Sequence, residues 1–243
     1  MSLPRFFIVH SESPCEGALV PLDAAQARHL NVRRARAGDP LELVLPGGAW
    51  RADLAELSRD KALARLVSPL EEEREAVIAL HAYIPVTAQL SLVDELLPPL
   101  VELGATLIQP VAYERSEADA AKTAARLERW RRIVASACEQ CHRTRIPELR
   151  EVFPFAALLA VATEQKWVAY ERGTGACNPE LRRGPLAFTS GPEGGITDAE
   201  FQALRLAGWQ PVSLGRAILR AVTAPVALLG AVQYQLEMKR DSG

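Results

Sequence analysis

The segment Gly191-Pro192-Glu193-Gly194-Gly195 constrains the fold of this chain more than any other stretch. It follows the apolar run Leu186–Ser190, which is typical of a buried strand. It precedes Thr197 and Glu200, whose spacing is a capping-box pattern that opens a helix. Glycine lets the backbone approach a ligand closely, and ligands of open α/β sheets bind past the carboxyl ends of the strands. We therefore expect a cofactor loop here, with an ordinary tight turn as the alternative.

A second segment, residues 212–224, follows the glycine loop. Its pattern predicts a strand, then an irregular loop and then a buried helix. Arg216 and Arg220 flank the apolar pair Ile218 and Leu219. A purine needs an apolar slot with backbone hydrogen-bonding groups at its edge, and this loop could supply both. An arginine could then face a phosphate or an RNA base, although merely solvated arginines are the alternative.

Residues 1–70 carry short alternating segments with turn signals, which predict a small β-rich domain, a barrel. Pro46-Gly47-Gly48 would form a hairpin loop, and the charged run Glu71-Glu72-Glu73-Arg74-Glu75 marks a linker over residues 71–76. The expected strands are Phe6–Val9, Leu41–Leu45, Ala49–Leu54 and Ala62–Val67.

From residue 77 to residue 243 strand-like and helix-like segments alternate, which predicts an α/β domain with a mostly parallel sheet covered on both faces. Pro98-Pro99 falls inside the first helix, and we expect a kink or a break there. The last helix is apolar almost all round and should be buried against something large. The expected strands are Val77–Ile84, Thr106–Val111, Lys166–Tyr170, Leu186–Ser190 and Pro211–Leu214, and the expected helices are Ala88–Leu103, Ala118–His142, Asp198–Ala207 and Thr223–Met238.

Composition sets wide limits on function. The 243 residues carry a formal net charge of -2, so global charge does not announce a nucleic-acid binder, and local patches matter more. No uninterrupted apolar run is long enough to span a bilayer, and the N-terminus lacks the long apolar stretch of a secretory signal. We therefore expect a cytoplasmic protein with no membrane partner.

Cys138-Glu139-Gln140-Cys141-His142 matches the C-x-x-C-H pattern of covalent haem attachment. We reject that interpretation because both cysteines share one helical stripe with apolar residues and are most simply small core residues. A zinc site would need further paired ligands, which the remaining Cys and His residues do not provide. The stripe consists of Trp130, Ile133, Val134, Ala137, Cys138 and Cys141.

The chain is similar to the RsmE-type 16S rRNA uridine-N3 methyltransferases of the SPOUT superfamily. The similarity consists of several motifs that occur in the same order as in that family. Each motif is weak alone, but together they cover nearly the whole chain at family-like spacing. They are Arg5-Phe6-Phe7, Gly38-Asp39, Glu102-Leu103-Gly104, Glu114-Arg115-Ser116, Trp130, Glu139-Gln140, Arg143, Pro147-Glu148, Gly191 to Gly195, Leu214-Gly215 and Ile218-Leu219-Arg220.

The resemblance implies an N-terminal PUA-like β-barrel that binds RNA and a C-terminal SPOUT-type α/β domain whose chain forms a trefoil knot. It implies a homodimer that uses S-adenosylmethionine to methylate N3 of a uridine in 16S rRNA or the small ribosomal subunit, without a metal. The resemblance places the cofactor against Thr189, Gly191, Pro192, Glu193, Gly194, Gly195, Ser213, Leu214, Gly215, Ile218 and Leu219.

The chemistry of the reaction adds two expectations. N3–H is weakly acidic, so a cationic neighbour that stabilises the developing anion would help, and Arg220 is our candidate. N3 also lies on the pairing edge, so the uridine must be single-stranded or flipped out. The side chains expected to contact RNA are Arg5, Arg33, Arg34, Arg115, Arg132, Gln140 and Arg143.

The chain departs from the family pattern at a few positions. Pro98-Pro99 occupies a helix where a lysine is common, Ala217 replaces an arginine, and Val222 replaces a glutamate. The stretch from His29 to Arg34 is one residue short, with Arg33 where a leucine is common. Two alternatives therefore stay open: an RNA-binding or ribosome-assembly protein of this fold with weakened catalysis, and a methyltransferase with a different target base. A Rossmann dehydrogenase is disfavoured because no G-x-G-x-x-G follows an early strand.

Overall fold

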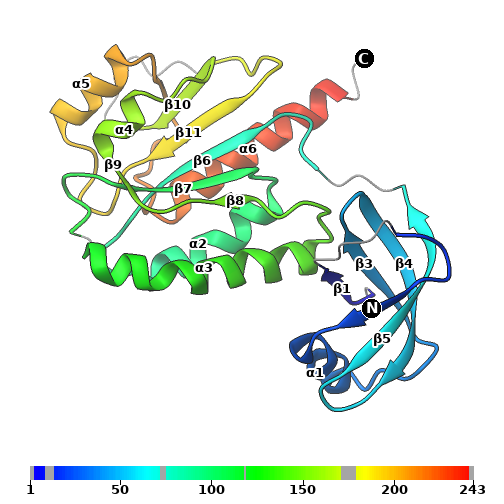
Figure 1. The fold of residues 1–243 in the computed structure, drawn as a ribbon. Helices are drawn as coiled ribbons and strands as arrows, with labels where there is room; N and C mark the ends of the chain where they lie inside the picture. Colours follow the sequence, from blue (N-terminus) through cyan, green and yellow to red (C-terminus); the bar gives the residue numbers. More distant parts are fainter. Residues whose placement is uncertain (1–2, 9–13, 72–74, 118, 171–178, 241–243) are drawn as a thin grey trace. The chain divides into compact units, whose positions relative to one another are not determined.

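The computed structural model describes residues 3–8, 14–71, 75–117, 119–170 and 179–240 (Figure 1). The chain divides into two compact units. One unit holds Met1–Glu75 and Cys138–Arg145, and the other holds Ala76–Ala137 and Ile146–Gly243. The predicted strand end Val9, the predicted helix start Ala118, Cys177 and residues 72–74 of the predicted linker lie outside the described residues.

The first unit is built on one five-stranded sheet. Its strands are β1 (Arg5–Phe7), β2 (Leu19–Leu22), β3 (Pro40–Leu45), β4 (Gly48–Leu57) and β5 (Ala62–Leu70). They lie in the order β1-β3-β4-β5-β2, with β1 parallel to β3 and the other pairs antiparallel. The predicted hairpin between β3 and β4 is confirmed, and Gly47 adopts a φ of 98° there. Because β1 and β2 occupy opposite edges, the sheet is a half-barrel rather than the closed barrel expected.

Helix α1 (Ala24–Val32) contributes to the core of the half-barrel and is absent from the elements expected above. It begins at a capping box in which Asp23 accepts from the Gln26 amide and the Gln26 side chain accepts from the Asp23 amide. Ala27 and Leu30 are buried in the same core cluster as the sheet residues. The helix therefore adds apolar surface to a core that an open sheet cannot close alone.

The first unit also includes residues 138–145, which begin in the last residues of helix α3 (Ala120–Cys141). Arg5 is 3% exposed, and its Nε donates to Glu42 Oε2 at 2.8 Å. The Arg5 guanidinium also donates to the carbonyl oxygens of His142 and Arg143. His142 Nδ1 lies 2.9 Å from the same Glu42 oxygen. A buried ion-pair network thus holds the segment after α3 against β1 and β3.

Glu75 forms a second buried network in this unit. Its carboxylate accepts from Arg143 Nε at 3.1 Å and from the backbone N–H groups of Thr144 and Arg145, each at 2.9 Å. Burial alone would raise the pKa of Glu75, but the Arg143 guanidinium and the two backbone donors hold it below its ordinary value. Because Arg143 is itself 3% exposed, both charges are removed from water and depend on each other.

Glu139 gives the first unit a pH-dependent stability. Burial, with a contribution from nearby Asp23, raises the pKa of Glu139 to about 7, although the carboxylate accepts from the Phe7 amide. The unfolded value is lower, so folding is penalised increasingly as pH rises from the unfolded pKa to the folded one.

We expect Glu139→Gln to be about as stable as the parent at pH 5 and more stable at pH 8, by about 1 kcal/mol because the group is only partly buried. Urea unfolding at the two pH values measures the difference. An equal effect at both would contradict this assignment.

The second unit contains a seven-stranded sheet in which every pair is parallel. The order is β12-β10-β11-β6-β7-β8, and β9 also pairs with β7. Register follows from pairs such as Leu186 with Leu80 and Gln165 with Leu186. The predicted parallel sheet is confirmed. Its strands are β6 (Leu80–Pro85), β7 (Leu107–Ala112), β8 (Glu148–Leu149), β9 (Phe153–Pro154), β10 (Gln165–Ala169), β11 (Leu186–Ser190) and β12 (Gln210–Val212).

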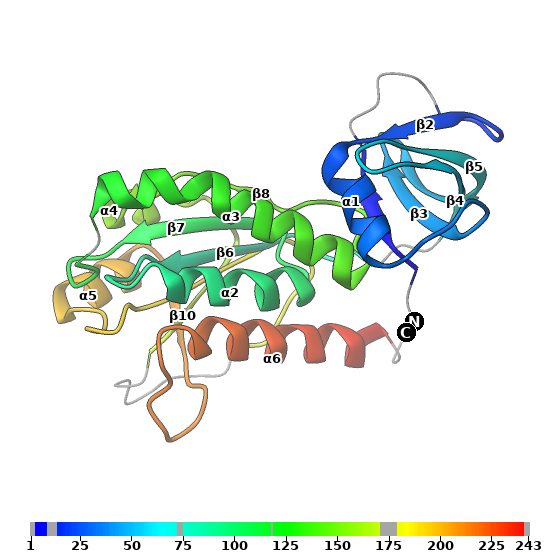
Figure 2. The same cartoon turned by 90° about the horizontal axis from the view of Figure 1, so that it is seen from below.

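Helices cover both faces of this sheet. They are α2 (Ser91–Glu102), the part of α3 up to Ala137, α4 (Phe155–Leu159), α5 (Asp198–Leu206) and α6 (Thr223–Arg240). Figure 2 shows α2 and α6 side by side along the sheet, and α6 contacts β10 and β11. Leu158 and Leu204, from α4 and α5, belong to a separate buried cluster with Tyr83 of β6. No described helix has the length and hydrophobicity needed to cross a bilayer.

Helix α6 is less buried than its composition suggests. Leu228, Leu229 and Val232 are fully buried, whereas Tyr234 is 68% and Met238 is 54% exposed. Within the single chain, the helix is therefore buried on one face and not all round.

Helix α2 continues through Pro98 and Pro99 without the predicted break. Tertiary contacts offset the cost of the prolines: Leu97, Leu100 and Val101 are fully buried. Asp94, one turn before Pro98, accepts from the Trp130 indole N–H at 2.8 Å and pairs with Arg126 and Arg129 of α3. Packing on both sides thus keeps a helix that sequence propensity alone would interrupt.

Candidate functional site

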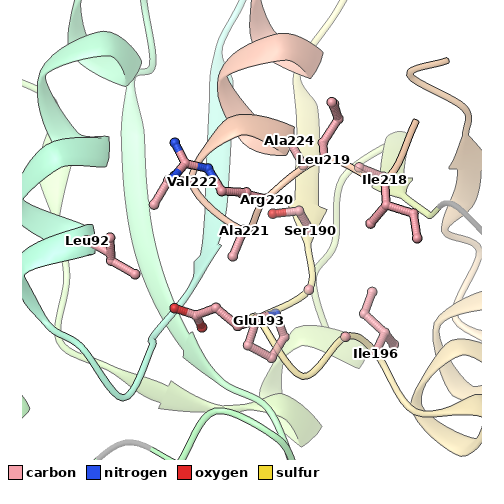
Figure 3. Close-up of a pocket in the computed structure, with 14 residues that line it drawn as sticks. Leu92, Ser190, Glu193, Ile196, Ile218, Leu219, Arg220, Ala221, Val222 and Ala224 are labelled. Carbon is pink, nitrogen blue, oxygen red and sulfur yellow. The ribbon is translucent and has the colours of Figure 1, made fainter. Parts of the chain in front are cut away.

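A cavity of about 320 Å³ opens at the carboxyl ends of β10 and β11 (Figure 3). Its wall comes from the glycine loop after β11, from residues 218–222 and Ala224 before and within α6, and from Leu92 of α2. The volume is in the range of pockets for small molecules. The lining residues are Leu92, Ala169, Ser190, Gly191, Pro192, Glu193, Gly195, Ile196, Ile218, Leu219, Arg220, Ala221, Val222 and Ala224.

The glycine loop is a tight, closely packed turn. The Gly195 amide donates to the Pro192 carbonyl at 2.8 Å, and Gly195 adopts a φ of 74°, which favours glycine. A Cβ on Gly191 would lie 2.7 Å from Ile196 Cγ1, so this glycine is required by the packing of the loop itself. The predicted capping box at the start of α5 is confirmed, with Thr197 and Glu200 bonded reciprocally.

The turn after β7 braces the glycine loop. Arg115 Nη1 donates to the Gly194 carbonyl at 2.9 Å, and a Cβ on Gly194 would lie 2.8 Å from Arg115 Cβ. The amide of Glu114 donates to Glu200 Oε1 at 2.8 Å. Gly194 does not line the cavity, so the contact that excludes a side chain there is with Arg115 rather than with a ligand.

Thr189 is placed in the core, away from the cavity. Its Oγ1 donates to the Tyr83 carbonyl at 2.7 Å and lies 2.6 Å from the Tyr113 hydroxyl. Since the single Thr189 proton is used, Tyr113 must be the donor in the second bond. Burial raises the pKa of Tyr113 far above its ordinary value, so the phenol stays protonated. The Thr189 side chain thus anchors the end of β11 from behind the site.

The second predicted loop reaches the cavity with only part of its length. Ile218, Leu219 and Arg220 line it, whereas the predicted contacts Ser213, Leu214 and Gly215 do not. The loop turns into α6 through Arg220, whose carbonyl accepts from the amides of Thr223 and Ala224. Of the positions that depart from the family pattern, Val222 lines the cavity and Ala217 does not.

Two opposite charges stand at the cavity. Glu193 and Arg220 are the charged side chains among its lining residues, and both are exposed. In Figure 3 both extend toward the side where Leu92 lies. The remaining lining residues are neutral, so the cavity has a charged mouth and a largely apolar wall.

The predicted RNA-contacting residues fall into two groups. Arg5 and Arg143 are buried and paired with Glu42 and Glu75, so their guanidinium groups already have protein partners. This geometry argues against direct RNA contact and gives the two residues a role in holding the first unit together. The exposed members of the set are Arg33, Arg34, Arg115, Arg132 and Gln140.

The cysteines have the structural role expected. Cys138 is fully buried, burial raises the pKa of its thiol to about 12, and Cys141 is half-buried. Within the described ranges, no cluster of three or more His, Cys, Asp or Glu side chains could hold a metal ion.

Sequence reasoning missed Ser190, the last residue of β11. The residue lines the cavity, and its hydroxyl oxygen is buried and has no hydrogen-bond partner among the described residues. A sequence cannot distinguish Ser190 from Thr189 in this respect, because every side chain of β11 is buried and no polar alternation shows which face each occupies.

Comparison with known proteins identifies the family of the chain. A family model for an RNA methyltransferase domain matches residues 74–233, and one for an RNA methyltransferase PUA domain matches residues 22–67. Ribosomal RNA small subunit methyltransferase E of Synechocystis is 34% identical, over 90% of this chain and 74% of the relative. The protein of the same name in Bacillus subtilis is 30% identical, over 98% of this chain and 99% of the relative.

Solved structures give the same result. Ribosomal RNA small subunit methyltransferase E of Neisseria gonorrhoeae, bound to S-adenosylmethionine, is 33% identical with a TM-score of 0.87, over 96% of this chain and 98% of that one. A methyltransferase of Legionella pneumophila with the same bound cofactor is 26% identical, also with a TM-score of 0.87, over 96% of this chain and 98% of that one. Together with the PUA-like half-barrel and the parallel α/β unit, these matches show that the chain belongs to the family of ribosomal RNA small subunit methyltransferase E.

Proposed function

We propose that this protein transfers a methyl group from S-adenosylmethionine to N3 of a uridine in 16S rRNA. The observation that carries the proposal is the cavity at the carboxyl end of β11, where the glycine loop and residues 218–222 meet in a member of this family. The rRNA substrate and the uridine come from the family, and the cavity supplies a place for the cofactor. A cytoplasmic location fits this function.

The residues at the cavity suit the cofactor in three ways. Gly191, Pro192 and Gly195 present backbone, and Ile218 and Leu219 present apolar surface. Ser190 adds a buried hydroxyl that has no partner in the described part of the chain. When bound, S-adenosylmethionine supplies an electrophilic methyl carbon on a sulfonium. The glycine loop, braced by Arg115 and Thr189, would fix the position of that ligand before RNA arrives.

Arg220 is the residue we assign to stabilise charge on the substrate. Its side chain is exposed at the mouth of the cavity, where a flipped uridine would enter. A guanidinium beside N3 and its flanking carbonyl oxygens would stabilise the anion that develops as the N3 proton leaves. Glu193 is the carboxylate among the lining residues, whereas Val222 offers no proton acceptor.

We further propose that RNA is bound by the exposed residues Arg33, Arg34, Arg132 and Gln140, with residues 1–70 as the RNA-binding domain, 71–76 as the linker and 77–243 as the methyltransferase domain. Arg33 and Arg34 follow α1 directly, and Arg34 has a φ of 57°, which turns the chain there. Arginines suit phosphate contacts because their planar guanidinium bonds two oxygens at once.

The SPOUT trefoil knot and the homodimer belong to the same proposal. Strand β12 is the edge strand beside β10, and residues 218–222, which come after it, line the cavity at the ends of β10 and β11. Tyr234 and Met238 on α6, with Ile218 at the cavity, leave apolar surface exposed that a second copy would cover.

The function is tested by incubating the protein with small-subunit rRNA, or with the small subunit itself, and isotopically labelled cofactor. Mass spectrometry of the digested RNA should locate the label on N3 of one uridine. Label on another position would mean that the protein methylates a different target base. A protein that binds RNA but neither binds the cofactor nor transfers the label would favour a role in ribosome assembly without catalysis.

A further inference from the structure

The last two residues of β11 point to opposite faces of the sheet, as alternation in a strand requires. Thr189 lies on the face with Tyr83 and Tyr113, and its hydroxyl has a partner in each direction. Ser190 lies on the face of α6, where its hydroxyl has no partner among the residues that the structure describes. Two adjacent buried hydroxyl groups thus differ completely in their hydrogen bonding.

The unpartnered hydroxyl of Ser190 is a cost to the protein without ligand. The residue is 1% exposed, so its oxygen is also shielded from water. Buried polar groups in native proteins nearly always have a partner, and leaving one without a partner lowers stability. An alanine would fit the same place without this cost. The presence of the hydroxyl therefore points to a ligand that forms the missing hydrogen bond.

The surroundings of Ser190 indicate which part of a ligand it meets. Ala169, Ala221 and Ala224 line the cavity with it, and Figure 3 shows the hydroxyl directed from the end of β11 toward Ala221 and Arg220. The charged side chains Glu193 and Arg220 extend instead toward Leu92. A neutral wall of small side chains suits a neutral group with hydrogen-bonding atoms, whereas a charged amino-acid end would be better paired at the mouth.

We infer that Ser190 is a cofactor-binding residue whose hydroxyl hydrogen-bonds the nucleoside part of S-adenosylmethionine, an inference that rests on the proposed function. The alanines that line the cavity with Ser190 carry no hydrogen-bonding group in their side chains, so they do not compete for its hydroxyl. The bond forms only in the loaded protein, so its formation relieves a cost that exists beforehand.

The variant Ser190→Ala separates this role from a structural one, because the two effects have opposite signs. Without ligand, the variant should melt about 2 °C higher than the parent, since an unpaired buried hydroxyl is gone. With ligand, its dissociation constant for S-adenosylmethionine should rise about tenfold, because the nucleoside group is left unpaired. Calorimetry gives the affinity, and thermal unfolding of the ligand-free protein gives the melting temperature.

The probe 5′-methylthioadenosine identifies the bonded part of the cofactor, since it keeps the nucleoside and lacks the amino-acid end. Ser190→Ala should weaken both ligands by the same factor. Weakening of S-adenosylmethionine alone would overturn the assignment to the nucleoside, and unchanged affinity for both would overturn the role of Ser190 altogether. A parent protein that binds neither ligand would instead refute the proposed function, and this inference with it.

Thr189→Val is the matched control, because it removes the neighbouring hydroxyl from the opposite face. It should lower the melting temperature of the ligand-free protein, since Tyr113 and the Tyr83 carbonyl lose their common partner. If Ser190→Ala lowered the melting temperature in the same way, Ser190 would be a structural residue and the inference would be wrong.

Discussion

Replacing Gly194 with valine should weaken binding of S-adenosylmethionine by at least about a hundredfold. A Cβ at this position would lie 2.8 Å from Arg115 Cβ and 3.3 Å from both the Cδ and the carbonyl oxygen of Arg115. The Cβ and the carbonyl oxygen of Arg115 are fixed by the backbone of the turn after β7 and cannot swing away, so the loop or the turn must move. A hundredfold loss corresponds to about 2.8 kcal/mol of binding free energy, which a displaced binding loop would forfeit. Calorimetric titration with the cofactor measures it.

Gly195→Ala provides the comparison, since its Cβ would meet nothing within 4 Å and only the φ of 74° is strained. Its loss of affinity should be much smaller, on the order of tenfold or less. The clash also predicts a rescue: Arg115→Gly removes the contacted Cβ and should restore part of the affinity lost in Gly194→Val. A Gly194→Val protein that binds like the parent would show that this loop does not shape the cofactor site.

Arg220→Ala should reduce the rate of methyl transfer by about a hundredfold or more while changing cofactor affinity by only a few fold. The expected asymmetry follows from the position of the side chain, which lies at the exposed mouth of the cavity rather than in its apolar wall. A cation that acts on the developing negative charge of the uridine contributes mainly in the transition state. Single-turnover transfer to rRNA and calorimetry of the cofactor separate the two quantities.

Arg216→Ala is the control for charge in the same loop. Arg216 is also exposed, but it does not line the cavity. Its removal should slow transfer far less than removal of Arg220. Equal losses in the two variants would mean that the loop contributes general positive charge for RNA binding. If Arg220→Ala reduced the transfer rate and the cofactor affinity by the same factor, Arg220 would not have the role assigned to it.

The elements predicted best are those whose signals are local. Strand β11 has the bounds expected, and α5 begins at the expected capping box, because buried apolar residues, glycines and a Thr–Glu pair lie within fifteen residues. Helix α1 also begins at a capping box, but its short amphipathic pattern is weak and was not identified. The continuity of α2 was not predictable, because the contacts that offset Pro98 and Pro99 come from elsewhere in the chain.

The residues of the site also include some that the sequence predicts and some that depend on the tertiary structure. Gly191, Glu193, Ile218 and Arg220 could be predicted to meet because two loops at the same end of a parallel sheet converge. The different surroundings of Ser190 and Thr189 depend on which face each side chain occupies, and a strand buried on both faces carries no pattern that reveals it.

The arginines expected to bind RNA could not all be judged from the sequence. Arg5 pairs with Glu42, and Arg143 pairs with Glu75, at separations of 37 and 68 residues. Charge patterning detects partners within a helix or on neighbouring turns, but not partners this far apart. Burial of a guanidinium is a property of the tertiary structure, so the sequence does not distinguish these two arginines from the exposed ones.

Residues 138–145 lie in the first unit although they begin inside α3, a helix whose other residues belong to the second, and this limits how the protein can be divided. A fragment that ends at residue 75 would keep Arg5 and Glu75 but lose the two carbonyl acceptors and the guanidinium that satisfy them. The Glu75 carboxylate would then lack its counter-charge, and the Arg5 guanidinium, although still paired with Glu42, would lack two acceptors, so folding would suffer. The unit that folds is discontinuous in the gene, so exchange of RNA-binding modules by simple end-to-end fusion would not preserve it.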